Sequence, residues 1–164
     1  MSPPSFRFPP AARMKSPKDF QRAFRQGNRA RGDVLVVAVV ENGGPVTRLG
    51  LSIGKSVWKG AVQRNRVRRV FREAFRLARP ELPAGLDVIM MAAAPGLKPN
   101  LAETQAELLR LVAKALSRYR EKLAQAQASQ ASQASQASSG PRSVSGAGTN
   151  ADDHKSGPTP ERGS

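Results

Sequence analysis

Basic side chains are concentrated in one stretch of the sequence, 61–79, and they are the groups best suited to bind a charged partner. Arranged as a helix at ~100° per residue, the stretch separates into an apolar face and a basic face. The apolar face consists of Val67, Val70, Phe71, Ala74, Phe75, Leu77 and Ala78. The basic face carries Asn65, Arg68, Arg69, Arg72, Arg76 and Arg79, with Arg64 and Arg66 at its edges. Like charges four residues apart repel each other by roughly 0.2–0.5 kcal/mol, and the only acid is Glu73, so this face predicts a polyanionic partner.

Residues that could perform acid–base, nucleophilic or metal chemistry are scarce. The only histidine, His154, lies in a low-complexity segment, and the chain has no cysteine. The acidic residues show neither the paired carboxylates of acid–base catalysis nor the spacing of metal ligands. A glycine-rich phosphate loop is also missing. The sequence therefore predicts no catalytic residue and no metal ligand in this chain.

The overall charge indicates the class of partner. The 164 residues carry a formal net charge of +15, and the bases and acids after Gln125 balance, so the first part of the chain holds all of the excess. Such a charge is typical of proteins that bind nucleic acid or an anionic membrane. No apolar run approaches the ~18 residues of a membrane span, and the first residues lack a signal-peptide core. We expect a cytoplasmic nucleic-acid-binding protein with no membrane partner.

Composition divides the chain into three parts. Residues 1–12 hold four prolines around two phenylalanines and predict an extended, mobile arm that cannot be helical. Residues 13–124 contain the hydrophobic patterns of a folded domain. Residues 125–164 begin with Gln-Ala-Ser repeats and continue with Gly, Ser and Pro, a composition that cannot bury enough apolar surface to fold. We expect them to be disordered.

The folded part predicts helices and strands in a mixed order. Helices are expected over 17–26, where Ser16 and Asp19 form a capping box, over 61–79 and over 101–123. Strands are expected over 34–40, 46–54 and 87–94, with a shorter one within 28–33. The turn signal at 41–45 predicts that 34–40 and 46–54 pair as an antiparallel hairpin. The fold class is α+β, one small mixed β-sheet packed with three helices.

Phe20 and Phe24 lie four residues apart on one face of the first helix. Both rings could be core anchors of an amphipathic helix. Alternatively, at least one ring could remain at a cleft and stack on a nucleic-acid base, an interaction of ~1–3 kcal/mol that tolerates any base. The residues leave both readings open.

The form of the nucleic acid follows from the motifs that are missing. Zinc-ligand spacing, a basic leucine zipper and the aromatic motif of an RNA-recognition domain are all missing, and a helix-turn-helix needs two adjacent helices. Arginines on one rigid helix suit bidentate phosphate contacts and stacking on a shaped RNA. We therefore expect a structured-RNA binder.

Four motifs in register resemble one family. The triplet Arg64-Asn65-Arg66, with its flanking residues, resembles the signature helix of the bacterial ribonuclease P protein subunit. The other motifs are Arg13 with Lys18-Asp19-Phe20, Phe24 and Gly27, the segment RLGLSIGK at 48–55, and the segment GLDVI at 85–89. The resemblance covers about residues 13 to 120.

This resemblance implies an accessory subunit whose RNA partner is the catalyst. The ribonuclease P RNA, with bound Mg²⁺, hydrolyses precursor tRNA to remove the 5′ leader, and the protein binds that RNA, 1:1, as well as the leader. It also implies a left-handed β-α-β crossover, an exception to the usual right-handed rule. The residues implied to contact the catalytic RNA are Arg64, Asn65, Arg66, Arg68, Arg69 and Arg72. Those implied to line the leader cleft are Phe20, Phe24, Val36 and Lys55, with Arg13 and Lys59 as further basic contacts.

The sequence departs from the family pattern in four places. Ser56 stands where the family often has a second lysine, and Ala92-Ala93-Ala94 replace a common basic residue after the last strand. The strand 34–40 offers no aromatic ring, and the Gln-Ala-Ser segment matches no family feature.

Three alternatives remain at this stage. A ribosomal or ribosome-assembly protein would also be small, basic and RNA-binding, but it would not require the Arg-Asn-Arg register. A nuclease acting alone would need histidines or convergent carboxylates that the sequence lacks. Membrane or partner binding by the two termini is disfavoured by a neutral, unpatterned tail.

Overall fold

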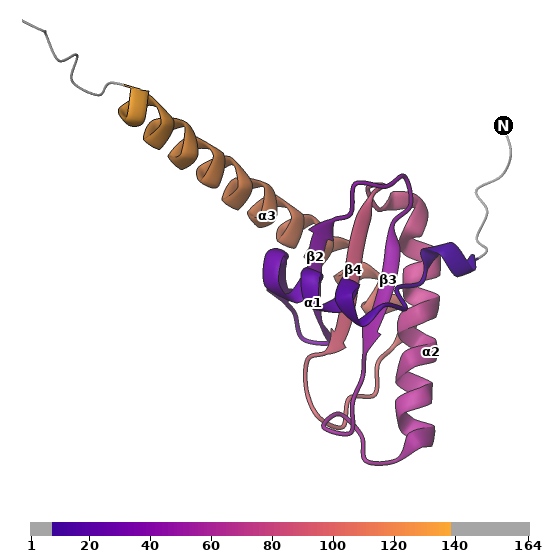
Figure 1. Ribbon diagram of the computed structural model, residues 1–164. Coiled ribbons are helices and arrows are strands. Elements are labelled where there is room, and N and C mark those ends of the chain that lie inside the picture. Colours follow the sequence, from indigo (N-terminus) through magenta and orange to yellow (C-terminus); the bar gives the residue numbers. More distant parts are fainter. Residues whose placement is uncertain (1–7, 139–164) are drawn as a thin grey trace, which may run out of the picture.

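A four-stranded sheet with helices packed against it forms the centre of the computed structural model, which describes residues 8–138 (Figure 1). The helices are α1 (Pro17–Gln26), α2 (Ala61–Ala78) and α3 (Leu101–Ser138), with 3-10 turns η1 (Pro10–Ala12) and η2 (Arg79–Glu81). The strands are β1 (Asn28–Arg31), β2 (Leu35–Glu41), β3 (Arg48–Ser52) and β4 (Leu86–Ala92). The predicted α+β class, a mixed sheet with three helices, is confirmed.

Strand β4 lies inside the sheet, in the order β1-β2-β4-β3. It pairs antiparallel with β2 and parallel with β3. The predicted hairpin between β2 and β3 is therefore wrong. Every residue from Leu86 to Met90 is buried. A position with a neighbouring strand on each side therefore buries more apolar surface when β4 occupies it than when the shorter β3 does. Because β3, α2 and β4 follow each other and the two strands are parallel neighbours, they form a β-α-β crossover, whose handedness stays an expectation from the family.

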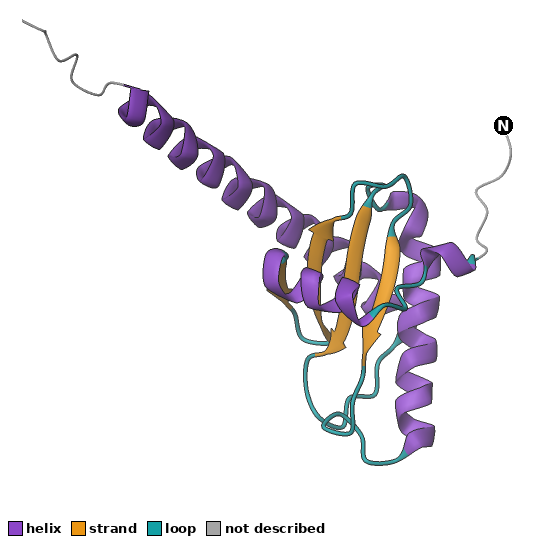
Figure 2. Cartoon of the chain, in the orientation of Figure 1, coloured by secondary structure: helices purple, strands orange, loops and turns teal. Residues whose placement is uncertain are grey.

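The helices occupy both faces of the sheet. Figure 2 shows α1 crossing one face, whereas α3 passes behind the strands and α2 runs alongside β3. Helices α2 and α3 pack on each other, and α3 also packs on β1 and β2. Phe71 and Phe75 of α2 and Leu108 and Leu111 of α3 are almost completely buried in this core.

Helix α2 has the two faces that its sequence predicts. Its buried residues are Val67, Phe71, Ala74, Phe75 and Ala78, and Val70 and Leu77 at the edges of this face are half-buried. Pro80 lacks the N–H that a continuing helix requires, and the chain passes into η2.

The N-terminal arm prediction is wrong for residues 8–12, and residues 1–7 lie outside the described part. The ring of Phe8 packs edge-on against Phe75, with 5.8 Å between ring centroids. Ala12 in η1 is fully buried, and the backbone N–H of Met14 donates to the Leu49 carbonyl, 2.9 Å away. The segment therefore covers the outer edge of β3, because contacts with distant residues outweigh its proline content.

Helix α3 is longer than predicted. It continues to Ser138, so the prediction of disorder is wrong for residues 125–138, while residues 139–164 lie outside the described part. No glycine or proline interrupts 101–138, and alanine and glutamine favour a helix that packing has already nucleated. The hydroxyls of Ser129, Ser132 and Ser135 donate to carbonyls four residues earlier. The extension projects from the body (Figure 1), with every side chain from Glu121 to Ser138 exposed.

Membrane insertion through a helix finds no support in the described residues. No helix between residues 8 and 138 combines the length and hydropathy needed to cross a bilayer.

Candidate RNA-binding surface

The outward face of α2 exposes a group of cations. Asn65, Arg66, Arg69 and Arg72 are exposed on the side opposite the buried phenylalanines. The one acid of this helix, Glu73, forms an ion pair with Arg76, and this hydrogen bond holds the pKa of Glu73 below its usual value. The remaining guanidinium groups form a positively charged surface, as the sequence predicts.

Two arginines predicted to contact RNA also hold the chain together. Arg64 Nη1 donates to the carbonyls of Trp58 and Lys59, 2.9 and 2.7 Å away. Arg68 Nη2 donates to the carbonyl of Ile53, 3.0 Å away. These bonds fix the segment after β3 against the start of α2. A guanidinium carries five N–H donors, so both side chains retain donors for a partner.

A pocket of about 330 Å³ connects the basic helix to α1. Its lining residues are Phe8, Arg13, Met14, Phe20, Leu49, Leu51, Arg68 and Arg72. It therefore brings together residues from all three predicted groups: two arginines of α2, one ring of α1, and Arg13. The guanidinium of Arg13 also lies over the ring of Phe8, 5.1 Å from its centroid.

The two rings of α1 lie over opposite ends of one row of paired residues, which runs across the four strands through Arg29, Ala38, Ile89 and Gly50. Phe20 lies against Gly50 of β3 so closely that a Cβ atom there would come within 2.9 Å of the ring. Phe24 faces the guanidinium of Arg29 in β1, 5.0 Å from the ring centroid. Gly50 and Arg29 belong to the same row by strand register. Both rings are half-buried, so each packs on the sheet and keeps part of its surface accessible.

The next row of the same sheet face is open. By register it contains Arg31, Val36, Met91 and Ser52, and we call these four residues the open row. Val36 and Met91 are half-buried, and Arg31 and Ser52 are exposed. The predicted residue Val36 therefore lies on an accessible surface beside α1. Lys55, also exposed, follows β3 at this end of the sheet.

Lys55 and the other predicted lysine, Lys59, belong to a different hollow. Both line a pocket of about 540 Å³ beside Trp58. The structure thus places Phe20, Phe24 and Val36 on one sheet face, and sets the two lysines in the loop between β3 and α2.

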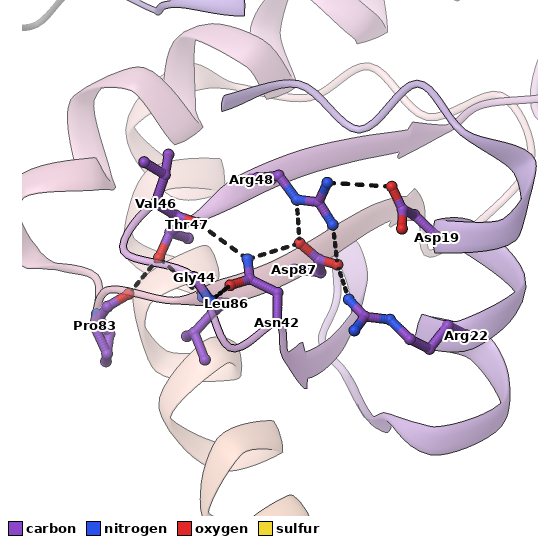
Figure 3. A network of polar contacts seen from close by, with 10 residues as sticks. All are labelled: Asp19, Arg22, Asn42, Gly44, Val46, Thr47, Arg48, Pro83, Leu86 and Asp87. Atoms are coloured by element: carbon purple, nitrogen blue, oxygen red, sulfur yellow. Dashed lines mark hydrogen bonds and ion pairs between the residues drawn. The ribbon is translucent and has the colours of Figure 1, made fainter. Parts of the chain in front are cut away.

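A buried carboxylate fixes α1 on the sheet (Figure 3). Asp87 of β4 is completely buried and accepts two hydrogen bonds of 2.7 Å from Nε and Nη2 of Arg48. It also accepts hydrogen bonds from Arg22 of α1 and from the amide of Asn42. Asp19, expected to cap α1 with Ser16, instead accepts a hydrogen bond from Arg48, 3.2 Å away, and no side-chain cap forms at the start of α1.

The Asp87 network sets the charge state of its central group. Burial alone would raise the pKa of Asp87, but the hydrogen bonds from Arg48 and Asn42 outweigh it, and the pKa lies below its usual value of 3.8. Asp87 therefore stays ionised at neutral pH and ties two strands to α1. Because α1 carries Phe20 and Phe24, this network decides where the rings lie.

Sequence reasoning missed several of these residues. Arg29 and Arg31 alternate around the buried Ala30, which is a sign of a strand with one basic face. The lone acid Asp87 at the start of a very apolar strand was a sign of a buried ion pair. Its two arginine partners are far away in sequence, so no local pattern identifies them.

The described residues do not provide a protein metal site. Within 8–138, no three His, Cys, Asp or Glu side chains converge so that they could hold an ion.

Comparison with known proteins decides the family. A family model described as Ribonuclease P matches residues 8–116. The chain belongs to the bacterial ribonuclease P protein family. The match begins at the first described residue and ends within α3, so the helical extension lies outside it.

Relatives and solved structures of the ribonuclease P family agree. The ribonuclease P protein component of Natranaerobius thermophilus is 35% identical over 102 residues, which cover 62% of this chain and 88% of that protein. The one from Syntrophobacter fumaroxidans is 40% identical over 92 residues, covering 56% and 76%. The Staphylococcus aureus RNase P protein structure aligns with a TM-score of 0.55 at 28% identity, covering 63% and 94%. The Thermotoga maritima RNase P protein aligns with a TM-score of 0.54 at 25% identity, covering 61% and 94%.

Proposed function

We propose that this chain is the protein subunit of ribonuclease P and that it assists a catalytic RNA in removing the 5′ leader of precursor tRNA. One observation carries the proposal. In a chain of this family, an exposed arginine face on α2 and a ring-bearing sheet face under α1 meet at a single pocket. A folded RNA and a single strand can therefore bind side by side.

The two surfaces suit different forms of RNA. Arg66, Arg69 and Arg72 project from a rigid helix, and guanidinium groups make bidentate contacts to phosphates, so we assign the α2 face to the catalytic RNA. Because the described residues present one such face, we propose a 1:1 complex with that RNA, and we propose the cytoplasm as its location.

We assign the leader of the precursor to the sheet face beside α1. Phe20 and Phe24 offer partly exposed rings there, and the open row adds Val36 and the cation of Arg31. Stacking on aromatic rings tolerates any base, which suits a strand whose sequence varies between precursors.

The chemical step belongs to the RNA in this proposal. The described side chains do not fit a metal site, so we assign Mg²⁺ to the RNA and derive no step from it here. The protein contributes by neutralising phosphates and by holding the leader.

The test is cleavage of a 5′-leader-bearing tRNA precursor by a bacterial ribonuclease P RNA at low Mg²⁺, with and without the full chain. We expect cleavage at the leader junction with the protein present, and little cleavage with the RNA alone. Cleavage by the protein without RNA would show that the chain is itself a nuclease. No effect in either mixture would contradict the proposal and would favour a ribosome-associated role.

A further inference from the structure

A second hollow on α2 differs in chemistry from the basic surface around it. This pocket of about 500 Å³ lies between the first half of α2 and the loop after β4. Its lining residues are Trp58, Gln63, Arg66, Val67, Val70, Leu97, Lys98 and Pro99. The described residues around it thus combine one aromatic ring and several aliphatic groups with two cations and no acid. We call it the Trp58 pocket.

Hydrogen bonds hold the walls of the Trp58 pocket in place. The indole Nε1 of Trp58 donates to the carbonyl of Leu97, 2.9 Å away. The backbone N–H of Gly96 donates to the carbonyl of Val57, 2.7 Å away, and Arg64 holds the Trp58 carbonyl. The two loops and the helix are therefore tied to each other, and an occupant would not have to order them. Such preorganisation favours binding.

The lining of the Trp58 pocket matches the parts of a nucleotide. A base needs flat or apolar surfaces on its faces, and its phosphate needs cations at the rim. Its volume lies within the ~300–1,000 Å³ typical of small-ligand sites. Structured RNAs expose unstacked bases in loops and bulges, and proteins read them by stacking on aromatic side chains.

The position of the Trp58 pocket indicates which molecule would bind there. Arg66 belongs both to the pocket and to the exposed arginine face of α2. An RNA lying on that face would bring phosphates to the pocket rim, where Lys98, from a different element, adds a second exposed cation. Charge complementarity therefore favours the RNA on α2 over a neutral or basic partner.

We propose that the Trp58 pocket receives one unstacked nucleotide of the ribonuclease P RNA, with its base against Trp58 and its phosphate near Arg66 and Lys98. The inference rests on the proposed function, since it needs the RNA to lie on α2. It adds a base-reading site to a surface otherwise explained by phosphate contacts.

Trp58 is the only tryptophan in the chain, so its fluorescence reports on this pocket and on the neighbouring pocket around Lys55 and Lys59, which it also lines. The experiment titrates the full-length protein with a bacterial ribonuclease P RNA transcript. Affinity is measured by filter binding, and Trp58 emission is measured at saturation. We expect the emission to be strongly quenched when the RNA binds.

Two variants separate the Trp58 pocket from the rest of the surface. Lys98→Glu reverses an exposed rim charge, and we expect about tenfold weaker binding at ~0.1 M salt for the loss of one phosphate contact. Lys122→Glu makes the same change on the exposed part of α3 and should bind like the parent chain.

Val70→Phe fills the Trp58 pocket from the helix side. Val70 does not line the neighbouring pocket around Lys55 and Lys59, so this variant tests one hollow alone. We expect roughly 5- to 150-fold weaker RNA binding, the equivalent of one lost base stack of ~1–3 kcal/mol, and no quenching of Trp58 by the RNA. Circular dichroism confirms that the variant is folded.

The outcomes distinguish this inference from the proposed function. If the parent chain binds no ribonuclease P RNA, the proposed function fails and the inference fails with it. If the parent binds tightly but Trp58 emission does not change, or Lys98→Glu behaves like Lys122→Glu, only the inference is overturned. Quenching by precursor tRNA without the ribonuclease P RNA would also overturn it, because the occupant would be a different RNA.

Discussion

The arginines of α2 fall into two groups when they are considered one residue at a time. Arg64 and Arg68 bind backbone carbonyls of the preceding loop as well as facing outward. Arg69 and Arg72 are exposed. Substitutions in the first group would change both RNA binding and local structure, so the second group gives the cleaner test of phosphate contacts.

We expect Arg69→Ala to weaken binding to ribonuclease P RNA and to lower the slope of log K against log salt by roughly one. The physical reason is that a cation bound to a phosphate releases one counterion from the RNA, and the variant no longer does so. Filter binding between 50 and 400 mM salt measures it, and Arg118→Ala, exposed on α3, is the matched control. A slope equal to that of the control would mean that Arg69 touches no phosphate.

Phe20 has a packing role and a proposed stacking role, and a conservative variant separates them. Phe20→Leu keeps an apolar group on Gly50 but removes the aromatic face. We expect binding to precursor tRNA to weaken by roughly 1–3 kcal/mol, the value of one base stack, with mature tRNA nearly unaffected. Competition binding with the two RNAs measures the difference, and equal losses on both would contradict a leader contact.

Among the elements, α1 depends on a tertiary ion pair for its position. Arg22 of α1 forms an ion pair with the buried Asp87 of β4, and Arg48 of β3 binds the same carboxylate. This contact holds α1 on the sheet, so that its rings face the sheet. Helix α1 is only ten residues long, and isolated helices of that length are marginal in water. The proposed leader surface therefore exists only in the folded chain.

We expect Asp87→Asn to lower the free energy of unfolding by roughly 2–4 kcal/mol, because Arg22 and Arg48 lose their shared buried carboxylate, while Arg48 keeps its contact with Asp19. This loss of stability lies towards the lower end of the range for broken buried ion pairs, since the side chains of Arg22 and Arg48 are 33% and 27% exposed. Urea unfolding at pH 7 measures it. Asp33→Asn, the same change at an exposed residue, should have almost no effect.

The contribution of Asp87 also has a defined pH dependence. Its folded pKa lies below the ordinary value of 3.8, so its stabilisation is complete above that pH and is lost as the pH falls through the folded pKa. We expect the stability difference between the parent chain and Asp87→Asn to be constant from pH 7 to about pH 5. It should shrink below 3.8. A difference that already shrinks near pH 6 would contradict this assignment, because the Asp87 carboxyl is ionised at that pH.

Considered as a whole molecule, the protein separates a folded, strongly basic body from a neutral helical extension. Residues 121–138 are exposed throughout, so the extension contributes helix without adding to the core. The family match ends at residue 116, and neither the proposed function nor the Trp58 pocket needs the extension.

We expect a chain that ends at Ala124 to keep its stability within ~0.5 kcal/mol, as for changes at exposed sites. Its circular dichroism at 222 nm should lose the signal of the helical residues 125–138. Thermal unfolding and RNA binding of the two chains provide the comparison. A markedly lower melting temperature would mean that residues after Ala124 pack on the body.

The sequence alone determined the features that depend on neighbouring residues. The two faces of α2, the positions of the other helices and strands, and the excess of cations all follow from local spacing and charge. The same local reasoning failed in 125–138, where composition indicated disorder, and in residues 8–12, where prolines hid the contact between Phe8 and Phe75.

Only the tertiary structure decided the arrangement of the sheet and of the surfaces built on it. Strand β4 enters between β2 and β3, which are adjacent in the chain, because strand pairing is chosen by burial across the whole core rather than by the turn between neighbours. The Asp87 network and the Trp58 pocket each join residues about forty or more positions apart. Such contacts depend on where distant segments pack, and no local pattern in a single sequence records that.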